Sequence, residues 1–329
     1  MPNVNDKPAV TSAHAPGAAP APGADPAPGA DPAPGAAPGP ASTPGPATAA
    51  GTWLLGGDLP VHRMGFGAMR LPGRTWEGPA GDPRAARAVL RRAVELGVDH
   101  IDTAAFYFHK DLSANTFIRE ALHPYSDDLV IATKVGPDRD RDHNWLDAAD
   151  PAKLKADVHR NLRELGRDHL DLVYLRFLGT DGPGDGRFGA LAELREQGLI
   201  RHLGVSNATP AQLAEAQAVA PVAAVQNRFS PGHRDAEARA MIALCAHQGI
   251  AYVPFFPLGG AGAPHIAGLR AVADRHGATA AQVTLAWSLA VSPAMLAIPG
   301  TSSLAHLEEN AAAAGLRLEA ADLAELTAD

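Results

Sequence analysis

The stretch 129–177 contains, in order, the apolar run "LVIATKVG", the amphipathic segment "DPAKLKADVHRNLRELG" and a second apolar run, "HLDLVYLRF". Asp150 and Pro151 are typical of a helix N-cap and first helical position, and Gly166 is typical of a helix end. A short apolar run, a capped helix and another apolar run predict two parallel strands joined by a crossover helix.

The same unit recurs from residue 64 onward. The other apolar runs expected as strands are 64–69, 100–104, 202–207, 222–227, 250–258 and 295–300. The other expected helices cover 82–97, 113–122, 186–197, a segment starting at 209, 234–248 and 279–291, with a final helix starting near 302. Eight repeats in about 270 residues favour a closed (β/α)8 TIM barrel over an open sheet. The first run also lacks the G-x-G-x-x-G of a doubly wound dinucleotide fold, and "WLLGGDLPVHRMGF" before it predicts a hairpin that closes the barrel floor.

Residues 1–52 have a different composition. They are mostly Pro, Ala, Gly and Asp, contain no aromatic residue and repeat every six residues in "PGADPAPGADPAPGA". Such a segment has too little to bury to offset the entropy lost on ordering. We therefore predict a disordered, partly polyproline-II tail over 1–52, with a docking arm or spacer as the functional alternative, and one barrel domain over 53–329.

Composition narrows the possible partners and location. The beginning of the chain lacks the basic and apolar pattern of a signal peptide, and no stretch has the roughly 20 apolar residues of a membrane span. The single cysteine, Cys245, lies in an apolar helix pattern, and the net charge of −8 has no long run of one sign. We expect a cytoplasmic protein, a monomer or small homo-oligomer, that acts on a small molecule rather than on nucleic acid or a membrane.

Polar residues end several of the predicted strands, where a buried core would not require them. They are Asp102, Lys134, Arg176, Ser206 with Asn207, and Gln226 with Asn227. In a (β/α)8 barrel the active site lies at the carboxyl ends of the strands. Because a lone buried charge is costly, these groups are expected to pair with one another around one mouth.

Asp102, Lys134 and Tyr107 suggest acid–base chemistry. Tyr107 follows Asp102 by five residues, close enough to return to the same mouth. An ammonium beside a phenol favours the phenolate, and a carboxylate holds the lysine in place. The phenol could then give a proton to a carbonyl oxygen as a hydride arrives. Each residue alone could be structural, since a strand-end Asp is commonly a helix cap or an ion-pair partner.

Several motifs resemble the aldo-keto reductases, in order and over most of 64–314. They are "GVDHIDTAAFY", "IATKVG", "HLDLVYL", "LIRHLGVSN", "VQN", "PFFPLGG" and "IPGTSSLAHLEEN". The resemblance implies a (β/α)8 barrel, a nicotinamide cofactor across its mouth, and reduction of aldehydes or ketones. It also implies catalytic roles for Asp102, for Tyr107 as proton donor, and for Lys134.

The resemblance further implies the cofactor contacts. Ser206, Asn207 and Gln226 match positions that hold the nicotinamide carboxamide, and Phe255 stands where the family usually stacks a tyrosine on the ring. The remaining implied positions are Gly67, Met69, Leu258, Gly259, Gly260, Gly300, Thr301, Ser302, Ser303, His306, Glu309 and Asn310.

The choice between NADPH and NADH depends on the segment after residue 299. Ser302 and Ser303 open a helix whose free N–H groups favour a phosphate, although a plain helix cap would look the same. Gly300 and His306 occupy positions where many family members have a basic residue. NADPH is the cofactor we predict, ahead of NADH.

Arg176 departs from the family pattern, because most members have a histidine five residues after the position of Asp171. Arginine is always cationic and presents a fixed fork of donors. It could bind the substrate oxygen, pair with an anionic substrate group, or merely pair with Asp102 or another carboxylate. A bacterial pyridoxal-reductase-like subgroup also has "LR" here, and pyridoxal carries a phenolic oxygen that can ionise.

Weaker candidates lie in the loops. Trp76 and His109 could line the substrate pocket, although for His109 we favour a solvated loop position. The segment 138–145, "DRDRDHNW", lacks a recurring ligand spacing and is interpreted as a solvated loop, so no metal site is predicted. The resulting prediction is NADPH-dependent reduction of a small, aromatic or heteroaromatic, aldehyde or ketone. The alternative is a cofactor-binding regulatory or sensor subunit with little turnover.

Overall fold

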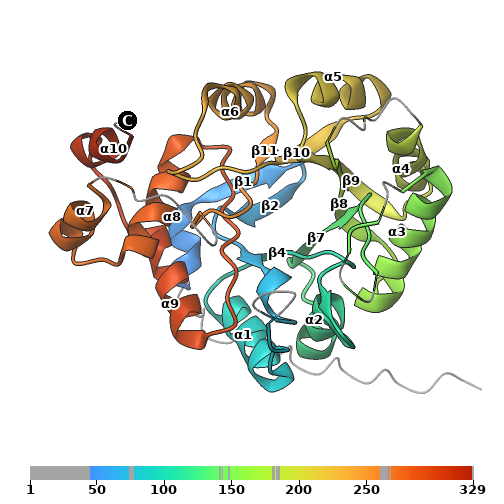
Figure 1. Cartoon of the computed structure of the whole chain (residues 1–329), viewed down its shortest axis with the longest axis horizontal. Helices are drawn as coiled ribbons and strands as arrows, with labels where there is room; N and C mark the ends of the chain where they lie inside the picture. Colours follow the sequence, from blue (N-terminus) through green and yellow to red (C-terminus); the bar gives the residue numbers. More distant parts are fainter. Residues whose placement is uncertain are drawn as a thin grey trace, which may run out of the picture. The chain divides into compact units, whose positions relative to one another are not determined.

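Seven of the predicted strand segments form one parallel sheet. The computed structural model describes residues 45–73, 78–140, 142, 144–146, 149–179, 182, 186–259, 266 and 268–327. The strand order is β11-β10-β9-β8-β7-β4-β3, and the sheet curls into a barrel wall (Figure 1). The strands are β3 Phe66–Gly67, β4 His100–Asp102, β7 Val130–Val135, β8 Leu170–Arg176, β9 Ile200–Ser206, β10 Val222–Gln226 and β11 Ala251–Tyr252.

The segment 294–299 closes this sheet into a ring. On one side, Tyr252 N donates to Ala294 O at 2.8 Å, and Leu296 N donates to Tyr252 O at 2.9 Å. On the other side, Gly65 N donates to Ala297 O at 2.8 Å. The segment therefore takes the place of the eighth strand through two isolated parallel bridges, and the predicted (β/α)8 barrel is confirmed.

Two glycines allow this closure. A Cβ atom on Gly300 would lie 2.5 Å from the carbonyl oxygen of Gly67, and one on Gly67 would lie 2.7 Å from that of Ile298. Real Cβ atoms do not come this close to a carbonyl oxygen, so the chain segments can approach only without side chains at these two positions.

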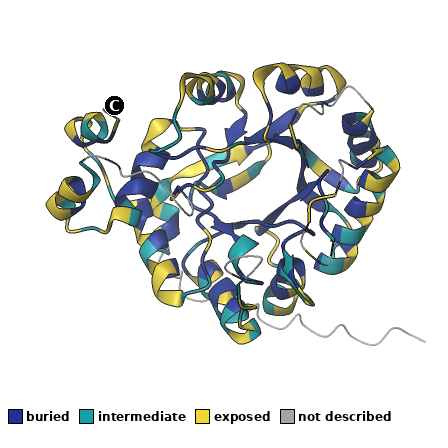
Figure 2. Ribbon diagram, in the orientation of Figure 1, coloured by how far each residue is buried: buried dark blue, intermediate teal, exposed yellow. Residues whose placement is uncertain are grey.

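Helices surround the sheet, with their buried sides inward and their exposed sides outward (Figure 2). They are α1 Pro83–Glu95, α2 Ala114–Leu122, α3 Pro151–Leu165, α4 Arg187–Glu196, α5 Pro210–Val219, α6 Ala236–Gln248, α8 Ala280–Val291 and α9 Leu304–Ala312. The predicted caps are present, since Asp82 and Asp150 accept from Arg84 N and Lys153 N. No helix in the described part of the chain is long and apolar enough to span a membrane.

Two further helices were not predicted from the sequence. They are α7 Leu269–His276 and α10 Ala320–Thr327, so the prediction of a final helix at α9 was wrong. Each is only eight residues long and buries few apolar side chains, among them Val272 in α7 and Leu326 in α10. A pattern this short and this polar gives a weak helical periodicity.

An antiparallel hairpin covers the amino-terminal end of the barrel, as predicted. Strands β1 Thr52–Leu55 and β2 Leu59–His62 form this hairpin. Leu55 and Val61 are buried in one cluster with residues early in the barrel strands, such as Val130. This apolar plug seals the barrel floor.

The folded body begins earlier than residue 53. Residues Pro46–Ala50 form the 3-10 helix η1, Ala47 is fully buried, and its N–H donates to Leu96 O at 3.0 Å. The assignment of this short segment to the tail was wrong because a small side chain fits against the end of α1. Residues 1–44 lie outside the described residues, and the disordered tail stays a prediction there.

The barrel interior follows the two-residue period of the strands. Leu172, Tyr174 and Arg176 alternate with outward-facing residues along β8, and the first two lie in the inner cluster. Gly204 leaves room for the Tyr174 ring, because a Cβ atom there would lie 2.6 Å from Tyr174 Cδ1. Side chains such as Leu172 and Tyr174 therefore fill the barrel interior between the floor and Arg176.

Candidate active site

Asp102 and Lys134 form a buried ion pair at the ends of the neighbouring strands β4 and β7. Lys134 Nζ donates to Asp102 Oδ1 at 2.6 Å and to the Thr103 carbonyl oxygen at 3.0 Å. Lys134 is 1% exposed and Asp102 is 4% exposed. The predicted pairing is present, and the ammonium is held by two acceptors.

Gln226 at the end of β10 holds the other carboxylate oxygen. Its Nε2 donates to Asp102 Oδ2 at 2.7 Å, and its side chain is buried. The carboxylate is thus fixed between Lys134 and Gln226, which come from opposite parts of the barrel.

Tyr107 lies in the loop after β4, with its ring beside the lysine. The Lys134 Nζ atom is 4.8 Å from the centre of the Tyr107 ring. The loop is pinned because Tyr107 N donates to Ala104 O at 3.0 Å and Arg160 Nη2 donates to Ala105 O at 3.0 Å. The structure therefore brings the three residues Asp102, Tyr107 and Lys134 together, as the sequence predicted.

A second tyrosine, Tyr174, also lies near the lysine, with its ring centre 6.0 Å from Lys134 Nζ. It is 1% exposed. Burial raises the pKa of the Tyr174 hydroxyl well above its usual value and the Asp102 charge adds to this, whereas a hydrogen bond with Gln226 opposes it. Tyr174 therefore stays protonated. We did not predict a role for Tyr174 from the sequence. It lies two residues before Arg176 in the same strand, however, so its side chain is expected on the same side of the sheet.

A buried polar network lies behind the ion pair. Asn115 Oδ1 accepts from Thr103 Oγ1 at 2.8 Å, and Asn161 Oδ1 accepts from Thr133 Oγ1 at 2.7 Å and from Asn115 Nδ2 at 3.0 Å. All four residues are fully buried. The two threonines adjoin Asp102 and Lys134 in the chain, so α2 and α3 fix the ends of both strands. This network was also missed in the sequence.

Arg176 emerges at the mouth at the end of β8. Its Nη1 donates to Ser206 Oγ at 3.3 Å, and its guanidinium carbon is 5.1 Å from the centre of the Phe255 ring. Its Nε is shielded from solvent and has no hydrogen-bond partner among the described residues. No ion pair joins Arg176 to a carboxylate in the part of the chain that the structure describes. The interpretation of Arg176 as a partner of Asp102 was therefore wrong, since Lys134 and Gln226 occupy both carboxylate oxygens.

Most residues expected to hold the nicotinamide lie together at the ends of β9 to β11. Ser206 is fully buried and pairs in register with Gln226. Asn207 has a left-handed backbone, φ 58°, and its Nδ2 donates to Phe177 O at 3.1 Å. Phe255 is half-buried, and its N–H donates to Asn227 O at 3.0 Å.

The predicted phosphate-binding segment forms the start of α9. Ser303 is its N-cap and accepts from His306 N at 3.4 Å, while Thr301 Oγ1 accepts from Ser303 N at 3.0 Å. Glu309 accepts a hydrogen bond from Thr279, and Asn310 is buried.

The other predicted cofactor positions are spread over nearby loops. Met69 lies in the 3-10 helix η2 Ala68–Arg70, and Leu258 and Gly259 follow β11. Gly260 lies outside the described residues.

The weaker substrate candidates fare differently. Trp76 lies outside the described residues. His109 is 4% exposed and its Nε2 is 2.8 Å from Gly78 O, so the interpretation as a solvated loop histidine was wrong. His109 lies in the hairpin of β5 Phe108–His109 and β6 Leu112–Ser113, and its side chain contacts the backbone of Gly78.

The loop 138–145 is also more structured than expected. Arg139 is buried, and its guanidinium carbon is 4.7 Å from the centre of the Trp145 ring. Trp145 in turn lies edge-on to Phe106, with ring centres 5.7 Å apart. The interpretation of the whole loop as solvated was wrong, because Arg139 and Trp145 pack together beside the tyrosine loop. His143 lies outside the described residues, and no cluster of metal ligands occurs among those described.

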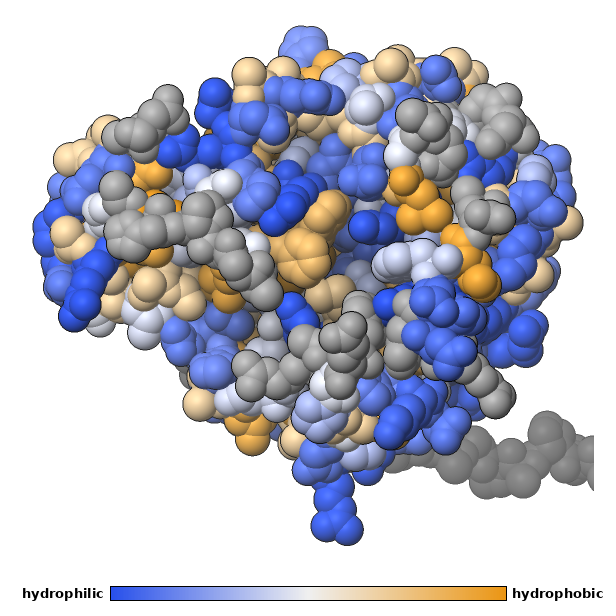
Figure 3. All heavy atoms as spheres, viewed as in Figure 1, coloured by the Kyte–Doolittle hydropathy of each residue, from blue (hydrophilic) through white to orange (hydrophobic). Residues whose placement is uncertain are grey.

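The mouth also carries apolar side chains. Exposed large apolar residues in loops after the barrel strands are Trp145, Leu146, Leu178, Phe256 and Leu258. Figure 3 shows a hollow near the centre of this face with hydrophobic side chains near its rim.

Comparisons with known proteins agree with this geometry. The model of the aldo/keto reductase family matches residues 63–328. Pyridoxine 4-dehydrogenase of Escherichia coli is 51% identical over 268 residues, which cover 80% of this chain and 92% of that protein. Among solved structures, the holo form of aldo-keto reductase AKR11C1 from Bacillus halodurans has a TM-score of 0.70 at 26% identity, covering 84% of this chain and 94% of that one. An aldo/keto reductase from Klebsiella pneumoniae, solved with NADP and acetate, shares the fold with a TM-score of 0.69 at 24% identity, covering 84% of this chain and 93% of that one.

Proposed function

Because the chain belongs to the aldo/keto reductase family, and is thus an oxidoreductase acting on carbonyl or alcohol groups, we propose that it is an NADPH-dependent reductase of small aldehydes. The observation that supports this best is the arrangement of Tyr107, Lys134 and Asp102 at one barrel mouth. The substrate we propose is pyridoxal or a similar heteroaromatic aldehyde, since the pyridoxine 4-dehydrogenase of Escherichia coli is 51% identical.

The residues at the mouth fit a nicotinamide cofactor. Ser206 and Asn207 present polar side chains beside Gln226, and the half-buried Phe255 offers a ring for stacking. The N-terminus of α9, with Ser303 as its cap, suits an adenosine phosphate. A bound reduced nicotinamide would supply the hydride for the carbonyl carbon.

The chain's own residues handle the proton. Tyr107 gives its hydroxyl proton to the carbonyl oxygen, and the Lys134 ammonium stabilises the resulting phenolate. Asp102 holds the ammonium in place, because it accepts from Lys134 at 2.6 Å. Tyr174 cannot replace Tyr107, because it is enclosed in the barrel core and burial holds its proton.

Arg176 supplies the oxygen-binding donor that a histidine gives in most of the family. Among the described strand-end residues, Asp102 is a carboxylate and Lys134 and Arg176 are cations, which leaves one positive charge in excess at the strand ends. Such an excess stabilises the negative charge that develops on the carbonyl oxygen. Ser206 and Phe255 hold the guanidinium without neutralising it.

The test is a panel of aldehydes, including pyridoxal, with NADPH and with NADH. The absorbance of the reduced nicotinamide reports turnover. Sustained oxidation of NADPH with at least one aldehyde supports the proposal, and a clear preference for NADH would correct the cofactor. Tight cofactor binding with no more than one slow turnover would instead identify a sensor subunit.

A further inference from the structure

The tyrosine loop, residues 103–107, is held at both of its ends by the first turn of α2. At one end, Thr103 Oγ1 donates to Asn115 Oδ1 at 2.8 Å. At the other end, Ala114 N donates to Tyr107 O at 3.0 Å. The two α2 residues are neighbours in the chain, so one short piece of helix holds both the start of the loop and Tyr107.

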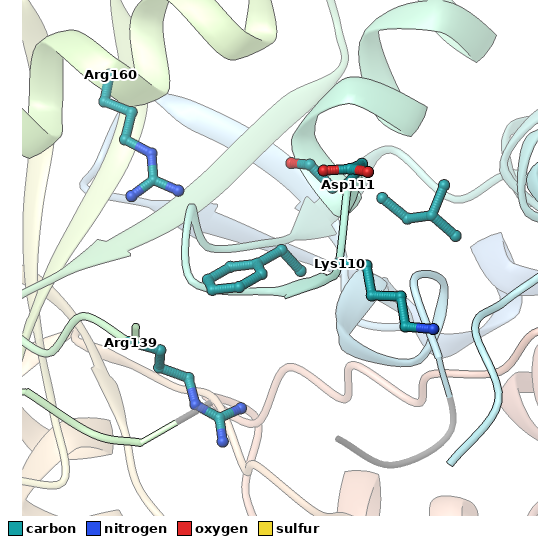
Figure 4. A pocket seen from close by; sticks show the side chains of 7 residues that line it. Lys110, Asp111, Arg139 and Arg160 are labelled. Atoms are coloured by element: carbon teal, nitrogen blue, oxygen red, sulfur yellow. The ribbon is translucent and has the colours of Figure 1, made fainter. Parts of the chain in front are cut away.

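The middle of the tyrosine loop is held by α3. Arg160 Nη2 donates to Ala105 O at 3.0 Å, and Arg160 Nε donates to Glu164 Oε1 at 2.8 Å. Figure 4 shows Arg160 reaching from its helix toward the hairpin that carries Lys110, which follows the tyrosine loop in the chain. The Arg160 guanidinium is also 3.5 Å from Asp138. Its charge is thus paired with two carboxylates, and its contact with the loop is a support.

Asn115 joins these two supports. Its Nδ2 donates to Glu164 Oε2 at 3.0 Å and to Asn161 Oδ1 at 3.0 Å. The same Glu164 carboxylate accepts from Arg160. Asn115 is fully buried, and with the bond from Thr103 its amide group makes three hydrogen bonds. Both its donor and its acceptor side are therefore engaged, which fixes the orientation of the side chain.

The network also reaches the buried ion pair of the site. Thr103 O accepts from Lys134 Nζ at 3.0 Å, so the residue that Asn115 holds is itself one of the two acceptors of the ammonium. On the neighbouring strand, Asn161 Oδ1 accepts from Thr133 Oγ1 at 2.7 Å, and Thr133 directly precedes Lys134. Asn115 is thus connected both to a partner of the ammonium and to the strand that carries the lysine.

The proposed proton transfer depends on where the tyrosine loop lies. Lys134 Nζ is 4.8 Å from the centre of the Tyr107 ring, and the effect of a cation on a phenol depends on their separation. Proton transfer also requires the hydroxyl to be within hydrogen-bond reach of the carbonyl oxygen. A displacement of about 1 Å can lower a rate by roughly 100-fold. Contacts that hold the loop therefore affect the rate without touching substrate or cofactor.

We propose that Asn115 is a positioning residue for the reaction. It sets the place of Tyr107 relative to Lys134, through Thr103 on one side and through Glu164 and the loop contact of Arg160 on the other. The inference rests on the proposed reductase function and deepens it, because it names the buried side chain on which the geometry of the proton donor depends.

The test separates side-chain shape from hydrogen bonding at Thr103. Thr103→Val keeps the shape and removes the hydroxyl that donates to Asn115, so kcat should fall about tenfold while KM for the aldehyde changes less than about twofold. Thr103→Ser keeps the hydroxyl and loses a methyl group, so it should retain more of kcat than Thr103→Val at an equal or lower melting temperature. Asn115→Ala, the more severe variant, should lower kcat by up to about 100-fold.

The matched control is Thr284→Val on α8. Thr284 is buried, and its Oγ1 donates to Ala280 O at 2.8 Å within the same helix. The control loses a buried hydroxyl bond of the same length as the one from Thr103, and kcat should stay close to that of the wild type.

A second measurement, amide hydrogen exchange over residues 103–114, does not depend on turnover. Tyr107 N donates to Ala104 O and Ala114 N donates to Tyr107 O within this segment. Both N–H groups should exchange faster in Asn115→Ala and in the valine variant of Thr103, because the loop opens more readily when its supports are removed. The α8 control should leave the exchange of this segment unchanged.

The outcomes distinguish this inference from the reductase proposal. Wild-type kcat in both Asn115→Ala and Thr103→Val, an equal loss in Thr284→Val, or a rise of KM at constant kcat would overturn the positioning role while the reductase function stands. If Asn115→Ala does not fold, Thr103→Val decides. If the wild type turns over no aldehyde, the reductase proposal fails, and unchanged hydrogen exchange in the folded variants would then show that Asn115 does not hold the loop.

Discussion

The two ends of the barrel interior differ sharply. At the floor, the β1–β2 hairpin inserts Leu55 and Val61 into an apolar cluster. At the mouth, the strands end in Asp102, Lys134 and Arg176, and the loops contain left-handed residues. The floor stabilises the fold by burying apolar area, whereas the mouth keeps a cation without a carboxylate partner among the described residues. The apolar contacts that stabilise the fold and the residues of the proposed chemistry therefore lie at opposite ends of the same strands.

The largest loss of activity is expected at the mouth, for substitution of Tyr107. Tyr107→Phe removes the proposed proton donor and should lower kcat by about 100- to 10,000-fold, while cofactor affinity stays close to that of the wild type. The matched control is Tyr174→Phe, which removes the other hydroxyl near Lys134 and should retain most of the activity. Steady-state kinetics with the best aldehyde and fluorescence titration with NADPH measure both variants. Equal losses in the two variants would contradict the assignment of the donor.

Arg176 should give the next largest effect. Arg176→Ala removes the proposed donor to the carbonyl oxygen and should lower kcat/KM by roughly 100-fold. Arg176→His restores a donor of the kind most of the family has, so we expect partial activity with a changed preference among aldehydes. Kinetics with pyridoxal and with benzaldehyde measure this preference. Wild-type behaviour of Arg176→Ala on every aldehyde would reduce the residue to a structural role.

Substitutions at the barrel floor should lower the free energy of unfolding but leave the activity nearly unchanged. Leu55→Ala leaves a cavity in the plug and should lower the free energy of unfolding by about 2–3 kcal/mol. Chemical denaturation measures this loss, and activity per folded molecule should stay within a factor of two, roughly the effect of a distant site. The control Leu54→Ala changes a half-exposed neighbour, 52% exposed, and should cost much less. A large loss of kcat in Leu55→Ala would mean that the two ends are coupled.

The sequence alone was sufficient to predict the barrel and to predict that Asp102, Tyr107 and Lys134 lie together at its mouth. Asp-Pro helix starts and strand-end polar residues are local signals, so they could be interpreted without knowing the packing. The network through Asn115 and Asn161 could not be predicted, because it joins residues 46 positions apart in the chain. The burial of His109 likewise depends on Gly78, 31 positions away. η1 was missed because Ala47 finds its partner only in the folded barrel.

We expect the smallest effect on stability for Asp58, which lies in the turn of the β1–β2 hairpin and connects this hairpin to β9. Its carboxylate accepts from His202 Nε2 at 2.6 Å and from Arg201 Nη2 at 3.0 Å. Burial alone would raise the pKa of Asp58, but the hydrogen bonds from Arg201 and His202 outweigh burial and lower the pKa below its usual value. A group with a lowered folded pKa stabilises the protein above its unfolded pKa, and this stabilisation is lost as the pH falls through the folded value.

Asp58→Asn should therefore cost less than about 1 kcal/mol at neutral pH, because the pair is largely exposed to solvent. The difference in melting temperature from the wild type should shrink as the pH falls from about 4 toward 3 and below. Thermal denaturation between neutral and acidic pH measures it, with Asp127→Asn as an exposed control that should show no such trend. A difference that grows on acidification would mean that the ties from Arg201 and His202 do not hold the hairpin in solution. The floor would then be sealed by Leu55 and Val61 alone.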